Sequence, residues 1–144
     1  MDRSETRLVI AQFCRQLILS QNPVRLCDLE ATPKQEEFLH RVFKEELEHR
    51  ERLRKARLFQ RAAFPVRKTL DAYEWNALRL PTTLLPDELT SCQFVRDKKN
   101  LVLYGPVGTG KTHLAIALGV KACELGIATR FFTAASLVTR LSES

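Results

Sequence analysis

The most constraining feature of this chain of 144 residues is the octapeptide Gly105-Pro106-Val107-Gly108-Thr109-Gly110-Lys111-Thr112. It matches the pattern G-x-x-x-x-G-K-[ST] at every constrained position. The glycines let a turn wrap closely around an anion, because glycine takes left-handed backbone conformations without steric cost. The octapeptide is therefore predicted to cradle the phosphates of a nucleoside triphosphate.

Two side chains and the following helix complete the predicted nucleotide site. Lys111 is expected to place its ammonium on the β- and γ-phosphates, and the hydroxyl of Thr112 to bind Mg²⁺. The helix that follows would direct the positive end of its dipole at the phosphates. The residues expected to contact ATP are Gly105, Pro106, Val107, Gly108, Thr109, Gly110, Lys111, Thr112 and His113.

The sequence around the octapeptide predicts an α/β fold. Residues 100–104 have the pattern of a short buried strand, residues 113–125 that of a helix, and residues 128–133 that of a second strand. Gly126 is predicted to cap the helix in a left-handed conformation. A strand, a helix and a strand with short connections predict a right-handed βαβ unit, the first part of a doubly wound parallel P-loop sheet.

The region before this unit is predicted to be helical. A first helix is expected over residues 5–20 with Ser4 as its cap, and a helical turn over residues 24–29. A long helix is expected to begin at the capping box Thr32-Pro33-Lys34-Gln35 and to end before Phe64-Pro65.

Three regions follow from this organisation: a helical region over residues 1–68 for DNA or partner binding, a connector over 69–99, and the nucleotide-binding part over 100–144. In the connector, Tyr73 and Trp75 are interpreted as core anchors rather than as a platform that stacks on a nucleotide base. Short helices are expected over residues 87–94 and from residue 134 to residue 141.

The net charge of +6 is concentrated in one segment. Its basic residues are Arg50, Arg52, Arg54, Lys55, Arg57, Arg61, Arg67 and Lys68, against the single acid Glu51. A solvated helix face with Glu–Arg pairs would explain residues 37–51. From Arg52 onward acids are lacking, so the segment is predicted to contact the phosphodiester backbone of DNA without sequence preference.

Composition excludes several other classes of protein. With 44% hydrophobic and 28% charged residues the chain has a soluble globular composition, no stretch is long and apolar enough to span a membrane, and a cytoplasmic location is expected. The four cysteines are widely spaced without a C-x-x-C pair, so they are expected to be reduced packing residues, and no zinc site is predicted.

The residues needed for hydrolysis are not recognisable. Phosphoryl transfer in this class requires an acid at the end of another strand and a cation for the γ-phosphate. The only carboxylate side chains after Lys111 are Glu124 and Glu143, and neither follows an apolar strand. No catalytic residue is therefore predicted, and the chain is expected to be a fragment of a longer ATPase, marginally stable or self-associating by itself.

Residues 100–119 closely resemble the IstB-like proteins, the ATP-binding helper subunits of insertion-sequence transposition. Residues 131–137, 38–57, 62–65 and 68–70 resemble the same family. This resemblance implies an AAA+ P-loop ATPase that uses ATP and Mg²⁺, acts on DNA, assists a transposase, and forms a homo-oligomer in its full-length form. The Walker B acids, sensor residue and arginine finger of the family have no counterpart in this sequence.

Three other functions stay open. A DnaC-like loader of the replicative helicase shares the AAA+ core, and a gene for a helicase rather than a transposase beside this one would favour it. A noncatalytic nucleotide- or DNA-binding module would bind ATP without turnover. A small-metabolite P-loop kinase is disfavoured, since the basic helical region has no role in such an enzyme.

Overall fold

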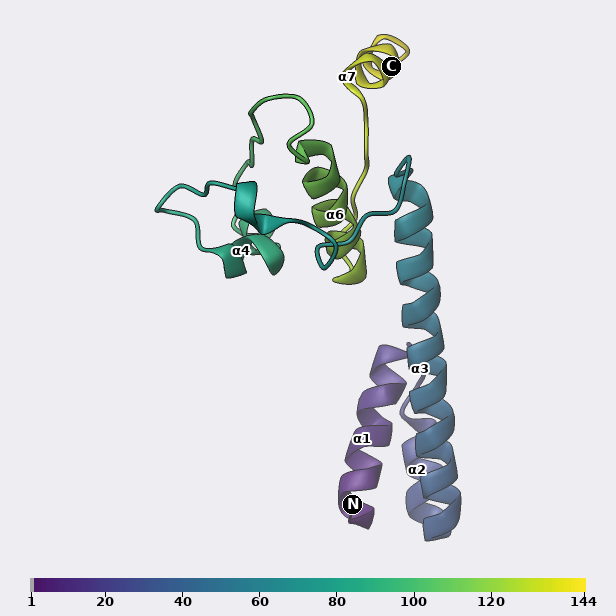
Figure 1. Ribbon diagram of the computed structural model, residues 1–144. Helices are drawn as coiled ribbons and strands as arrows, with labels where there is room; N and C mark the ends of the chain where they lie inside the picture. Colours follow the sequence, from purple (N-terminus) through teal and green to yellow (C-terminus); the bar gives the residue numbers. More distant parts are fainter. Residues whose placement is uncertain (1) are drawn as a thin grey trace. The chain divides into compact units, whose positions relative to one another are not determined.

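The computed structural model describes residues 2–144, which form two compact units divided between Arg54 and Lys55. The elements along the chain are α1 (Arg3–Gln16), α2 (Asn22–Leu29), α3 (Pro33–Ala62), the 3₁₀ turn η1 (Trp75–Ala77), α4 (Pro86–Thr90), α5 (Gln93–Arg96), α6 (Lys111–Glu124) and α7 (Ala134–Ser142) (Figure 1). Helix α3 runs from the first unit into the second, and each unit is described by itself.

The predicted α/β fold class is wrong for this structure, because no β-strand occurs in residues 2–144. Residues 100–104 and 128–133, predicted as strands of a βαβ unit, are irregular. A strand exists only when a neighbouring backbone completes its hydrogen-bond ladder. Here the N–H of Phe131 donates instead to the carbonyl of Ala62 at 2.8 Å, and Val102 and Tyr104 are 78% and 91% exposed.

In the first unit, α1 and α2 lie beside the N-terminal part of α3 (Figure 1). Ile10, Cys14 and Cys27 form its buried core. The cap of α1 is Asp2 rather than the predicted Ser4: its carboxylate accepts the N–H of Arg3 at 2.6 Å, and Glu5 accepts the N–H of Asp2 at 3.1 Å.

A buried carboxylate joins α1 to α3. Glu36 is 1% exposed, and its Oε1 accepts hydrogen bonds from Arg3 Nη2 at 3.0 Å and Arg7 Nε at 2.9 Å. The hydrogen bond from Arg3, the largest effect, together with that from Arg7, lowers the pKa of Glu36, although desolvation opposes them. Arg3 also donates to the Ala31 carbonyl at 2.6 Å, so one ion-pair cluster fixes both helices and the turn before α3.

The predicted start of α3 is confirmed in detail. Gln35 Oε1 accepts the N–H of Thr32 at 2.7 Å, and Thr32 Oγ1 accepts the N–H of Gln35 at 3.4 Å. This reciprocal pair satisfies two backbone groups that the helix start would otherwise leave without partners. The helix ends at Ala62, and Ala63 then takes a left-handed conformation with φ 55°.

In the second unit, the core packs against one side of α6. Tyr73, Leu89, Leu114 and Leu118 are buried together, with Trp75 among the partly buried residues packed against them. Gly126 ends the helix segment with φ 79° and donates its N–H to the carbonyl of Cys123 at 3.0 Å, as predicted.

Gly119 allows a close approach to α6 from another part of this unit. A Cβ atom there would lie 2.7 Å from Phe64 Cε1, inside van der Waals contact. The ring of Phe64 in turn lies 5.7 Å from that of Phe59 and 6.5 Å from that of Phe131. The absence of a side chain at residue 119 thus lets this aromatic cluster cover the helix.

The four cysteines are buried and unpaired, as predicted. Burial raises the pKa of each thiol: Cys14, Cys27, Cys92 and Cys123. These thiols are therefore held in their neutral form and act as small apolar side chains.

Candidate nucleotide-binding site

The octapeptide forms a glycine-dependent loop that leads directly into α6. Gly108 and Gly110 have φ 81° and 83°, a region that residues with a side chain rarely adopt. Thr109 Oγ1 donates to the carbonyl of Pro106 at 2.8 Å, which closes the turn. Gly110 is the N-cap of α6, so the loop delivers the chain to the positive end of a helix of 14 residues.

Lys111 folds back over this loop. Its Nζ donates to the carbonyl oxygen of Gly105 at 2.7 Å and to that of Pro106 at 2.5 Å, and lies 3.4 Å from Thr109 Oγ1. These acceptors are neutral, and a phosphate oxygen would bind the ammonium more strongly because it carries charge. The lysine is therefore placed at the loop, where it can exchange carbonyl partners for an anion.

Thr112 and His113, in the first turn of α6, have different surroundings. Thr112 is exposed, so its hydroxyl is accessible to a metal ion and solvent. His113 Nε2 lies 3.2 Å from the carbonyl oxygen of Thr69, and its ring meets that of Tyr73 at 5.5 Å in an edge-on contact. The His113 side chain thus contacts the connector, and only its backbone N–H remains suited to an anion.

A cavity of about 430 Å³ opens beside the loop. Its volume lies in the range of small-molecule sites. The lining residues come from the connector, residues 102–104, the loop and α6; they are Tyr73, Ala77, Leu78, Arg79, Val102, Leu103, Tyr104, Pro106, Thr109, Lys111 and Leu114. The structure therefore brings Pro106, Thr109 and Lys111 of the predicted set to one cavity.

Arg79 in this cavity was not predicted from the sequence. It follows η1 in an irregular segment, and no spacing rule connects it with a loop more than twenty residues later. Tyr73 and Trp75 are core anchors, as predicted: Tyr73 is buried, and the two rings meet at 5.1 Å in a T-shaped contact.

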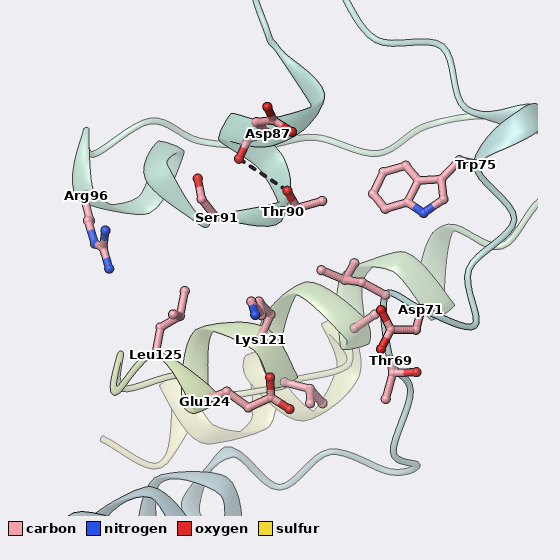
Figure 2. A pocket seen from close by; sticks show the side chains of 13 residues that line it. Thr69, Asp71, Trp75, Asp87, Thr90, Ser91, Arg96, Lys121, Glu124 and Leu125 are labelled. Carbon is pink, nitrogen blue, oxygen red and sulfur yellow. Dashed lines mark hydrogen bonds between the residues drawn. The ribbon is translucent and has the colours of Figure 1, made fainter.

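A larger cavity of about 740 Å³ lies elsewhere in the second unit, between α4 and α5 on one side and the C-terminal half of α6 on the other (Figure 2). Asp87, Thr90 and Ser91 face Lys121 and Glu124 across it, and Trp75 and Asp71 lie at one end. It contains no residue of the loop, so size alone does not identify the candidate site.

The residues predicted to contact DNA are mostly carried by α3. This helix bears Arg50, Arg52, Arg54, Lys55, Arg57 and Arg61, whereas Arg67 and Lys68 follow it in an irregular segment. Arg50 is paired with Glu46 at 2.7 Å and Arg54 with Glu51 at 3.5 Å. Arg67 lies over the ring of Phe59 at 5.0 Å.

Two of these arginines are neighbours on the part of α3 that belongs to the second unit. Arg57 and Arg61 are four residues apart, so they lie on one face of the helix. Both are exposed, and they take part in no ion pair within residues 2–144. We call these two residues the arginine stripe.

Within residues 2–144, no three or more histidine, cysteine, aspartate or glutamate side chains gather as a metal site would require. In that same part of the chain, no helix combines the length and the apolar character needed to cross a membrane.

A glycine loop at a helix N-terminus, with a lysine on the loop and a cavity beside it, is the arrangement of the P-loop class of nucleotide-binding proteins. Residues 21–144 match the family described as IstB-like ATP binding protein. The chain belongs to this family.

Individual relatives agree with the family match. The chain is 35% identical over 105 residues to a Geobacillus stearothermophilus protein described as ATP-binding in insertion sequence IS5376, a match that covers 73% of this chain and 42% of the relative. It is 33% identical over 108 residues to the corresponding IS21 protein of Pseudomonas aeruginosa, covering 75% and 41%. The chain thus spans about two fifths of the length of these relatives.

Proposed function

We propose that this chain binds ATP at the loop of residues 105–112, with Mg²⁺ held at Thr112. The observation that carries the proposal is the position of Lys111, whose ammonium lies on the loop carbonyls and lines the adjoining cavity. The glycine conformations and the start of α6 add backbone N–H groups and a helix dipole at the same place. The relatives described as ATP-binding support the same assignment.

Binding is proposed to occur without hydrolysis by residues 2–144 themselves. The residues that line the cavity include Lys111 and Arg79 but neither an aspartate nor a glutamate. Mg²⁺ and an attacking water are normally held by such a carboxylate in P-loop enzymes. In this proposal the chain is a nucleotide-binding module.

The biological setting proposed is assistance to a transposase on DNA. The matched relatives are described as proteins of insertion sequences, and transposition of such elements takes place on DNA. The arginine stripe supplies the matching chemistry, because exposed arginines on one helix face attract the phosphodiester backbone regardless of sequence. A helicase-loading role would use the same two surfaces but lacks the support of these relatives.

Ligand-dependent stability tests the nucleotide assignment. The thermal midpoint of the whole chain is followed with increasing ATP and Mg²⁺, beside Lys111→Ala and the control Lys121→Ala, which removes a lysine from the same helix outside the loop. A ligand at 100 times its Kd stabilises the folded state by about 2.7 kcal/mol. The thermal midpoints of wild type and Lys121→Ala should rise together with ligand concentration, while that of Lys111→Ala should stay constant. A rise of the thermal midpoint in all three proteins would contradict binding at the loop.

A further inference from the structure

A second cation lines the cavity beside Lys111. Arg79 belongs to the connector, far from the loop in sequence, yet both side chains line the same space of about 430 Å³. Arg79 is exposed and takes part in none of the ion pairs of residues 2–144. The lining thus carries two positive charges, and none of the residues that line the cavity is a carboxylate that would offset them.

The connector that carries Arg79 is fixed to the start of α6 by contacts that involve no ligand. His113 Nε2 lies 3.2 Å from the carbonyl oxygen of Thr69. The ring of Tyr73 meets His113 at 5.5 Å, and a Cβ atom on Gly110 would lie 3.3 Å from Tyr73 Cε2.

The chain between Tyr73 and Arg79 is ordered as well. Trp75 packs edge-on against Tyr73 at 5.1 Å, and the N–H of Leu78 donates to the carbonyl of Trp75 at 3.0 Å, closing η1. The backbone that presents Arg79 is therefore positioned at the cavity before any ligand binds, and this preorganisation lowers the entropic cost of using the arginine in binding.

We propose that Arg79 binds the phosphate chain of the nucleotide as a second cation, beside Lys111. This assignment rests on the proposed function of the loop. A guanidinium offers five N–H donors in a planar fork, which matches two phosphate oxygens at once, whereas the lysine acts as a point charge. Together the two residues give the cavity selectivity for a polyanionic ligand over a nucleoside.

Competition against a fluorescent ATP analogue on the whole chain tests the proposal. Kd values for ATP and AMP are measured, with Mg²⁺ present, for wild type, Arg79→Ala and Arg79→Gln. The control is Arg96→Ala, which removes an exposed arginine of the same unit that lines the other cavity. Far-UV circular dichroism of each variant checks that the helical content is retained.

The expected result is a loss of about tenfold in ATP affinity for both Arg79 variants, the size of one charge-assisted hydrogen bond. The loss for AMP should be smaller, because AMP has fewer phosphates to contact, and Arg96→Ala should match wild type. An equal loss for ATP and AMP would overturn the phosphate assignment and indicate a contact with the base or ribose.

Failure of the Arg79 assignment and failure of the proposed function give different results. If wild type binds ATP and the Arg79 variants bind it equally well, the second-cation proposal is wrong while the loop assignment stands. If wild type does not bind ATP at all, both are wrong.

Discussion

The Nζ atom of Lys111 lies 2.7 Å from the carbonyl oxygen of Gly105, so the lysine of the phosphate loop donates to its own loop backbone. The loop carbonyls hold the ammonium as neutral acceptors, and a phosphate can replace them with a charged one. The exchange is favourable because a phosphate oxygen carries negative charge, which adds a Coulomb attraction that a neutral carbonyl oxygen does not provide. Lys111 therefore already lies at the loop where ATP binding is proposed.

This arrangement predicts that another positively charged side chain at position 111 will not restore ATP binding. Lys111→Arg keeps a positive charge, but its planar fork cannot take the compact position of an ammonium between the carbonyls of Gly105 and Pro106. ATP affinity measured by fluorescence titration should fall by roughly tenfold or more. The control Lys121→Arg, on the same helix, should leave the affinity unchanged; wild-type affinity in Lys111→Arg would contradict the geometric role of the lysine.

The two loop glycines with positive φ predict different costs for alanine. Gly108→Ala meets only backbone strain, since a Cβ atom there has nothing within 4 Å, and should lower the free energy of unfolding by about 1–2 kcal/mol. Gly110→Ala adds a contact of 3.3 Å with Tyr73 Cε2 and should cost more. Urea denaturation measures the free energy of unfolding of both variants. An equal loss in the two would show that contact between the new Cβ atom and the Tyr73 ring adds no cost at residue 110.

Glu36 predicts acid sensitivity in the first unit. Because its pKa is lowered in the folded chain, its stabilising effect is full above the unfolded-state pKa of about 4.3 and is lost as the pH falls through the folded value. Glu36→Gln should lower the thermal midpoint by roughly 5 °C at pH 7, a figure reduced by the partial exposure of both arginines.

Measuring the thermal midpoints of wild type and Glu36→Gln over a range of pH provides the decisive comparison. The difference in thermal midpoint between wild type and Glu36→Gln should shrink below about pH 4, because Glu36 of the wild type then becomes protonated and loses the charge that the variant lacks. Glu37→Gln, which changes the exposed neighbour of Glu36 on α3, should behave as wild type throughout. A difference that stays constant down to pH 2.5 would indicate that packing, not ionisation, explains the effect.

The arginine stripe predicts salt-dependent DNA binding. Arg57→Ala combined with Arg61→Ala should weaken binding to unrelated duplexes alike and reduce the slope of log K against log salt by about 1.8, two phosphate contacts at roughly 0.9 each. The double variant Arg25→Ala with Lys34→Ala, which removes two exposed cations outside the stripe, serves as the control in fluorescence anisotropy. Binding that does not depend on salt would refute the role of the stripe.

Local signals in the sequence predicted local structure well. The capping box of Thr32 and Gln35 and the left-handed cap at Gly126 depend on groups within a few residues, and both are present as predicted. At the first helix the prediction of Ser4 as the cap was wrong, because the reciprocal hydrogen bonds between Asp2 and Glu5 start the helix earlier.

Features that depend on distant partners could not be predicted in this way. The hydrophobic run of residues 100–104 has the composition of a strand, but pairing is decided by another backbone, and Phe131 pairs with the end of α3 instead. Arg79 has no local signature either, since contacts between distant residues, such as the packing of Tyr73 against His113, bring the connector to the cavity. The loop of residues 105–112 could be predicted because the residues of its pattern are contiguous in the sequence.

Isothermal titration calorimetry of the whole chain with ATP and Mg²⁺ tests the central claim most directly. The account predicts one ATP per chain for wild type and loss of measurable binding in Lys111→Ala, with Lys121→Ala matching wild type. No heat of binding in wild type, or equal affinity in wild type and Lys111→Ala, would contradict a nucleotide site at residues 105–112.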